Sequence, residues 1–221
     1  MTVRVQAIGG LANRLRVALS YLAAYESQGI EIVWVPDGEI ANARFLDVFQ
    51  PIDGITFLDE GRGDELKSLN PLAGAWAHKY SLLVPVEKIR DRISILKIGR
   101  GPYAAMHIRR TDLPKEWFAS NEKDEDFVAW AKAQPMQVYV ATDNGTTQRA
   151  LVDWLGAHCF FNRPISVHDR QDDAGQRNTM LSDAVVDLFM CGGSKAFKGC
   201  VGSSFSTAVT HLRDNDGWWK R

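Results

Sequence analysis

Short apolar runs and stretches of helical periodicity alternate along most of this chain. The runs have the length of β-strands and cover residues 3–8, 30–35, 54–58, 103–108, 137–144, 159–161 and 196–201. The stretches with apolar residues three or four positions apart cover residues 11–28, 85–98, 127–133, 145–155, 180–189 and 208–212. Strands that alternate with helices in this way predict an α/β fold built on parallel sheets.

A segment rich in glycine divides the chain near its middle. Residues 99–102 read Gly-Arg-Gly-Pro, which is the strongest hinge signal in the sequence. At 221 residues the chain is long enough for two compact domains, each with its own core. We therefore predict one domain over residues 1–99, closed by the helix at 85–98, and a second over residues 100–221. Residues 61–65 are predicted to form a turn or loop.

Polar side chains directly follow three strands of the second half. They are His107, Arg109, Arg110, Thr142, Asp143, Ser203 and Ser204. Because the carboxyl ends of parallel strands meet at one edge of a sheet, we expect these groups to converge. Guanidinium groups and the N–H groups at helix starts both bind phosphate, so the predicted ligand carries a diphosphate. Each group taken alone also fits a surface loop with a few ion pairs.

Two further features suit the same ligand. Gly9 and Gly10 stand between a strand and a helix, where free backbone N–H groups can hold an anion, although a tight turn without a ligand is the alternative. This turn is neither a dinucleotide-binding fingerprint nor a P-loop, because the required spacing and the Lys-Ser/Thr pair are absent. Asp187 lies on the helix at 180–189 and could accept hydrogen bonds from a nucleotide base, or simply be an exposed helix residue.

Composition narrows the class of protein. A net charge of −1 with 45% hydrophobic residues argues against a nucleic-acid-binding surface and against disorder. The three cysteines have apolar neighbours and no metal-ligand spacing, which predicts reduced core thiols and no metal site. We see neither a signal peptide nor an apolar run long enough to span a membrane, and we predict a cytoplasmic protein without a transmembrane segment.

Four motifs in order resemble the fucosyltransferase superfamily, which includes the α-1,6, the α-1,2 and the protein O-fucosyltransferases. Residues 9–15, Gly-Gly-Leu-Ala-Asn-Arg-Leu, are similar to the N-terminal glycine motif of that family. Residues 107–112, His-Ile-Arg-Arg-Thr-Asp, resemble its H-x-R-R-x-D motif, and residues 139–143 resemble its Y-x-A-T-D strand. Residues 178–189 and 201–206 are similar to its third segment. The resemblance spans nearly the whole chain.

The resemblance implies two Rossmann-like domains that face a cleft, the GT-B arrangement, in a small version. The activity it implies is inverting transfer of fucose from GDP-fucose to a glycan, glycoconjugate or other hydroxyl acceptor, with no metal and no cofactor besides the donor. Arg109 would bind the β-phosphate, and His107 and Asp187 would lie near the guanosine. Ser203, Ser204 and the turn at residues 9–10 would line the diphosphate, and Arg110 and Asp112 would shape the motif. The implied donor-binding set is Gly9, Gly10, Asn13, Arg14, His107, Arg110, Thr142, Asp143, Asp187, Ser203, Ser204 and Phe205.

The catalytic set predicted from the resemblance is Arg109, Asp112 and Glu116. Glu116 is the candidate base that takes the acceptor proton, although it falls one place off the spacing seen in the α-1,6 branch. The chain is also shorter than typical members, so the acceptor is not carried over.

Other interpretations stay open. One is a transferase that uses another sugar on the same nucleotide, and another is a nucleotide-sugar-binding domain without catalysis. A flavodoxin-like or dehydrogenase domain fits the strand–helix rhythm but lacks the dinucleotide fingerprint.

Overall fold

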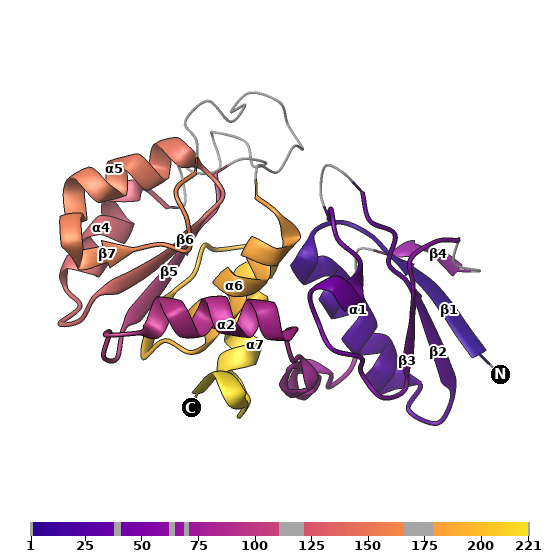
Figure 1. Ribbon diagram of the computed structural model, residues 1–221. Coiled ribbons are helices and arrows are strands. Elements are labelled where there is room, and N and C mark those ends of the chain that lie inside the picture. Colours follow the sequence, from indigo (N-terminus) through magenta and orange to yellow (C-terminus); the bar gives the residue numbers. More distant parts are fainter. Residues whose placement is uncertain are drawn as a thin grey trace.

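Two parallel four-stranded sheets, each flanked by helices, form the computed structural model (Figure 1). The structure describes residues 2–37, 41–61, 65–68, 71–110, 122–165 and 179–220. Within these residues, no helix combines the length and the apolar character needed to cross a bilayer.

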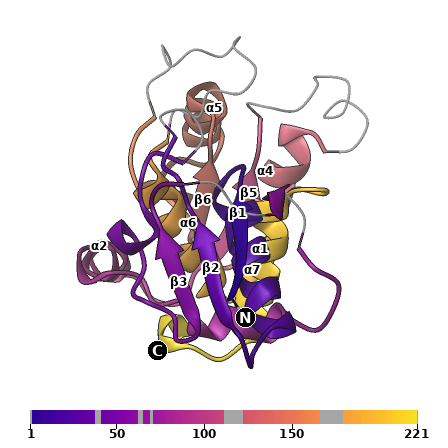
Figure 2. The ribbon, with the colours of Figure 1, turned by 90° about the vertical axis from the view of Figure 1, so that its right-hand side faces the viewer.

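The first sheet has the strand order β3-β2-β1-β4. Its strands are β1 (Thr2–Ala7), β2 (Gly29–Val33), β3 (Ile55–Leu58) and β4 (Glu65–Ser68). Figure 2 looks at the molecule from the side of this sheet and shows β2 and β3 running parallel in front. The prediction of a loop over residues 61–65 is wrong at its last residue, because β4 begins at Glu65 and pairs with β1.

Helix α1 (Leu11–Ala24) packs on one face of the first sheet. Val3, Val5 and Ala7 alternate along β1 with less buried residues and belong to the same core as α1. Arg4 and Glu31, which face each other across β1 and β2, form an ion pair at 2.5 Å. The alternation of β1 therefore turns its apolar side chains toward the helix and its charged ones away from it.

The second sheet has the order β7-β6-β5-β8 and is covered on both faces. Its strands are β5 (Ala104–Ile108), β6 (Val138–Thr142), β7 (Cys159–Phe160) and β8 (Ala196–Lys198). One face packs against α4 (Asp124–Lys132) and α5 (Gly145–Leu155), and the other packs against α6 (Leu181–Gly192). Helix α7 (Ser204–Asp214) follows β8 and packs against α6. Burial on both faces explains why β5 and β6 are almost wholly apolar in sequence.

Short 3-10 helices connect the larger elements. They are η1 (Phe45–Asp47), η2 (Ala77–Leu82), η3 (Gly156–His158) and η4 (Trp218–Lys220). Helix α2 (Glu87–Lys97) follows η2 and lies along α6 of the second half, as the ribbon shows (Figure 1). The domain boundary at residues 99 and 100 remains a prediction.

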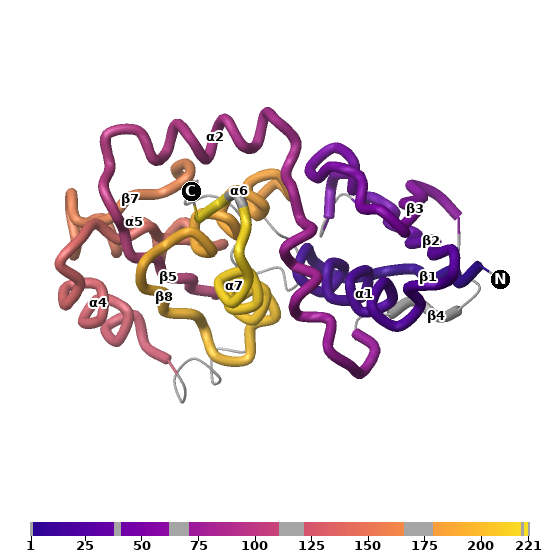
Figure 3. The backbone as a smooth tube through the Cα atoms, turned by 90° about the horizontal axis from the view of Figure 1, so that it is seen from below, coloured from indigo at the N-terminus to yellow at the C-terminus, as the bar shows by residue number. Residues whose placement is uncertain are grey.

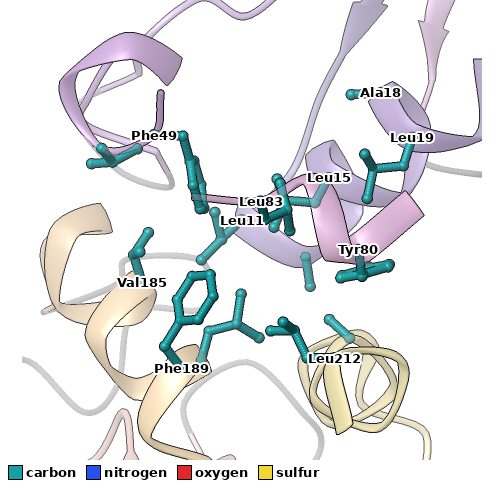
Figure 4. Close-up of a cluster of buried hydrophobic side chains, with 14 of the residues drawn as sticks. Leu11, Leu15, Ala18, Leu19, Phe49, Tyr80, Leu83, Val185, Phe189 and Leu212 are labelled. Atoms are coloured by element: carbon teal, nitrogen blue, oxygen red, sulfur yellow. The ribbon is translucent and has the colours of Figure 1, made fainter. Parts of the chain in front are cut away.

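One hydrophobic cluster joins the two halves. It contains Leu11 from α1, Phe49 after η1, and Val185 and Phe189 from α6, whose side chains face each other in Figure 4. The two halves also meet where η2 packs between α7 and α1 (Figure 3). The halves therefore share one core, which joins α1 to α6 and α7.

Candidate functional site

A hollow that is open to solvent lies at the carboxyl ends of β5 and β6. Its walls come from β5, β6, α6, α7 and the segments next to them. The lining residues are His107, Arg109, Thr142, Asp143, Thr179, Ala184, Asp187 and Phe205. Six of the residues predicted from the sequence thus converge here, which is what the parallel arrangement of β5 and β6 requires.

His107 is held from two sides. Its Nδ1 pairs with Ser206 Oγ at 2.9 Å, and its ring lies 4.5 Å from the ring of Phe205. The same Ser206 hydroxyl accepts a hydrogen bond from the Cys200 N–H at 2.9 Å. The sequence prediction missed Ser206 as a partner of His107. Its position three residues after Ser203, which caps α7, was the signal that could have found it, because it places Ser206 in the first turn of that helix.

The side chain of Arg110 makes several hydrogen bonds within the protein. Its guanidinium donates to Asp124 Oδ1 at 2.5 and 3.1 Å, and it also reaches the backbone oxygens of Arg109 and Glu122. Its backbone N–H donates to Asp143 Oδ1 at 2.9 Å. These contacts hold the segment after β5 in place and support the motif-shaping role that the resemblance implies. A direct contact between Arg110 and the donor remains a prediction.

Asp187 stands in the wall of the hollow on α6. Its Oδ1 accepts a hydrogen bond from the buried hydroxyl of Tyr139, on β6, at 2.5 Å. Burial raises the pKa of Asp187 to about 7, and the Tyr139 hydrogen bond works in the opposite direction. A carboxyl group with such a pKa changes its charge near neutral pH, which is a common property of functional sites.

A second hollow lies next to the first. The two share Thr142, Thr179 and Asp187 in their walls. On its far side the second hollow is lined by Arg163 and Asp183, which form an ion pair at 2.7 Å. The two hollows together place walls from β6, α6 and the segment after β7 around Asp187.

The predicted residues of the glycine turn lie in the N-terminal half and do not line this hollow. Gly9 adopts φ = 80°, a conformation that favours glycine, and Gly10 caps α1. Arg14 is nearly buried and donates to Gly9 O, Val35 O and Asp37 Oδ2 at 2.7 to 2.8 Å. It thereby ties the turn to the segment after β2. Asn13 is half-buried in the first turn of α1. Donor contacts by these residues remain predictions.

The remaining predicted residues divide into two groups. Ser203 and Ser204 lie at the start of α7, where the Ser203 hydroxyl accepts a hydrogen bond from the Ser206 N–H, and Phe205 of the same turn lines the hollow. Asp112 and Glu116 lie outside the described residues. Their assignment to the catalytic set stays a prediction.

The three cysteines are buried thiols, as the sequence predicted. Burial raises the pKa of both Cys191 and Cys200, so these thiols are un-ionised at neutral pH and poor nucleophiles. Across the described residues no cluster of His, Cys, Asp or Glu has the composition of a metal site.

No family model and no curated protein sequence matches this chain, but solved structures do. The structure of NodZ alpha-1,6-fucosyltransferase soaked with GDP-fucose superposes with a TM-score of 0.61 at 15% identity, over 95% of this chain and 92% of that one. The structure of NodZ from Bradyrhizobium superposes with a TM-score of 0.61 at 15% identity, over 95% of this chain and 93% of that one. The structure of POFUT1 in complex with GDP superposes with a TM-score of 0.62 at 13% identity, over 96% of this chain and 95% of that one.

This chain has the fold of the fucosyltransferases. The predicted resemblance to that superfamily and the predicted GT-B arrangement of two Rossmann-like units are confirmed at the level of the fold. In this fucosyltransferase fold the hollow belongs to the C-terminal half, and α6 and α7 bring Asp187 and Phe205 to it.

Proposed function

We propose that this protein is a glycosyltransferase that binds GDP-fucose and transfers the fucose to a hydroxyl group of a glycan or glycoconjugate, without a metal. The observation that carries the proposal is the convergence of Arg109, His107 and Asp187 on one hollow at the carboxyl edge of the second sheet. A cation, an imidazole and a carboxylate in one space suit the diphosphate, the ribose and the base of a nucleotide, respectively.

The proposed reaction needs stabilisation of a leaving group. The acceptor oxygen attacks the anomeric carbon as the bond from that carbon to the β-phosphate oxygen breaks, and the electron pair of that bond departs with GDP. Arg109, directly after β5, would neutralise the charge that develops on the diphosphate. A carboxylate would take the acceptor proton, and Glu116 is the candidate for this role. Attack from the side opposite to GDP inverts the anomeric centre.

The neighbours in fold support the choice of donor. They include a NodZ alpha-1,6-fucosyltransferase soaked with GDP-fucose and a POFUT1 in complex with GDP. The carboxylate of Asp187 adds a reason from this chain itself, because it can accept hydrogen bonds from the N–H groups of guanine.

A thermal-shift series with GDP, UDP, NAD and FMN tests the ligand class. A ligand that binds only the folded chain raises the melting temperature, so we expect a rise with GDP that exceeds the rise with any of the others. A larger shift with UDP, or no shift with GDP, would contradict the proposed donor.

Arg109→Ala tests the proposed catalysis. We expect kcat for fucose transfer, or for GDP-fucose hydrolysis, to fall by about 100-fold or more, because a preorganised donor to the departing charge is lost. Arg109→Lys should recover only part of the rate, since lysine cannot make two parallel hydrogen bonds to phosphate. EDTA should leave the wild-type rate unchanged.

The matched control for Arg109→Ala is Arg149→Ala, which removes an exposed arginine of α5 and should have no effect. Equal rates for wild type and Arg109→Ala would remove Arg109 from the mechanism. Strong GDP binding with no turnover of GDP-fucose in the wild type would identify a binding domain rather than an enzyme.

A further inference from the structure

Tyr139 reaches the hollow only through Asp187. Its side chain is fully buried under α6, with its ring packed edge-on against Phe160 at 5.2 Å between ring centroids. Its hydroxyl donates to Asp187 Oδ1. A ring held by close packing has little freedom to swing away, so the hydroxyl fixes the carboxylate that it contacts.

The carboxylate of Asp187 keeps hydrogen-bonding capacity for a ligand. Two oxygens together offer about four acceptor positions, and Tyr139 occupies one of them. Asp187 lines both hollows, so its remaining acceptor positions face the space where a base would lie. Guanine presents two adjacent donors, N1–H and the exocyclic amino group, which a fixed carboxylate can bind together. Adenine has an acceptor at N1 and would be repelled.

We propose that Tyr139 is a positioning residue for base recognition, whose hydroxyl holds the Asp187 carboxylate in the orientation that selects guanine. This inference rests on the proposed function and deepens it, because it adds Tyr139 as a residue that acts on the base through Asp187. Tyr139 itself touches no ligand in this scheme.

Several groups around Asp187 influence the pKa of its carboxyl group, in addition to the hydrogen bond from Tyr139. Asp183, one turn earlier on α6, disfavours the ionised form, whereas Arg92 of α2 and Arg163 after β7 favour it. His107, Arg109 and Asp143 share the hollow, and Cys191 lies one turn later on α6. Burial is the largest influence and raises the pKa of Asp187 to about 7, against the hydrogen bond from Tyr139. Guanine binding to the carboxylate should therefore weaken as pH falls through about 7.

Tyr139→Phe is the direct test, and the chain contains a matched control. Tyr103 is also buried, packs edge-on against the same Phe160 at 5.7 Å, and donates its hydroxyl to Met190 O of the same helix at 2.8 Å. Tyr103→Phe therefore removes one buried hydroxyl contact to α6 without touching Asp187. Affinities for GDP and for IDP, which lacks the exocyclic amino group, are measured by calorimetry between pH 5.5 and 8.5.

In wild type and Tyr103→Phe we expect GDP to bind more tightly than IDP, with the same pH midpoint. In Tyr139→Phe we expect GDP affinity to fall by about tenfold or more, because the lost hydrogen bond joins a charged group. The ratio of GDP to IDP affinity should approach one, and the midpoint should move to higher pH, since removal of the hydroxyl raises the pKa of the carboxyl further.

A double-variant cycle separates positioning from general stability. In an Asp187→Asn background, Tyr139→Phe should change the ratio of GDP to IDP affinity no further. If Tyr139→Phe matches Tyr103→Phe in selectivity and in pH midpoint, the positioning role is overturned while the proposed function stands. If wild type binds no GDP, the proposed function fails and this inference fails with it.

A measurement on wild type covers the case in which Tyr139→Phe does not fold. Carbon-13 NMR of aspartate-labelled protein should show that the Asp187 carboxyl titrates near pH 7 in the free protein and stops titrating there once GDP is bound. A titration of Asp187 that GDP leaves unchanged would overturn the inference.

Discussion

Burial sets the chemistry of Asp187. The unfolded chain releases the proton of an aspartate near pH 4, whereas the folded chain holds the Asp187 proton until the pKa of about 7. Between these two pH values the folded state binds the extra proton. The contribution of this group to stability is therefore complete below pH 4 and is lost as pH rises through 7. At neutral pH the carboxylate is a functional group that costs stability.

Asp187→Asn should expose this cost. Asparagine has the same shape and no charge, so we expect the variant without ligand to gain stability over wild type, and the gain to be larger at pH 8 than at pH 5 by at least about 1 kcal/mol. GDP affinity should fall at both pH values, because the amide turns a donor toward the base. Urea unfolding at the two pH values measures the difference. A difference between variant and wild type that is the same at both pH values would contradict the assigned ionisation.

At the scale of elements, a polar cluster docks α2 on α6. Asp183, on α6, has a nearly buried side chain and accepts a hydrogen bond from Arg92 of α2 at 2.6 Å. Arg163 and Asn162, after β7, reach the same carboxylate at 2.7 and 3.4 Å. Three segments that are distant in sequence thus meet at one acidic group beside the second hollow.

Asp183→Ala should loosen this junction. Three donors lose their acceptor, so we expect the free energy of unfolding to fall by about 2 kcal/mol in urea titrations. The control is Asp91→Ala, which removes an exposed aspartate of α2 and should stay within about 0.5 kcal/mol of wild type. If both variants behave alike, Asp183 does not hold α2 in place.

At the scale of the whole molecule, the shared core makes the two halves one folding unit. Leu11, Phe49 and Phe189 come from both halves and belong to the same cluster (Figure 4). Separate unfolding of either half would expose this surface to water, which costs free energy in proportion to its apolar area. We therefore expect a single cooperative transition.

Phe189→Ala tests this coupling. Its loss leaves a cavity between α6, Phe49 and Trp219, and we expect destabilisation by about 3 kcal/mol. Differential scanning calorimetry should show one peak before and after the change, with calorimetric and van't Hoff enthalpies equal. Ile95→Ala, at an exposed position of α2, should leave the peak where it is. Two peaks of which one alone moves would show that the halves unfold independently.

Local patterns in the sequence were enough to predict most of the elements and the edge at which the site forms. Apolar runs and helical spacing are properties of neighbouring residues, so β5, β6, α5 and α6 could be placed within a few positions. Polar residues directly after strands indicated the converging edge, because parallel strands end together. Strand β4 was missed because Glu65–Ser68 has no apolar run, and it is a strand through its pairing with β1.

The tertiary structure alone decided which side chains meet. His107 and Ser206 are 99 positions apart, and Tyr139 and Asp187 are 48 apart, so no local spacing predicts either contact. The buried face of α2, with Ile89 and Ile93, indicated that the helix is covered but not that α6 lies beside it. Chain periodicity specifies which residues become buried, whereas the packing of elements distant in sequence specifies their partners, and with them the charge and orientation of Asp187.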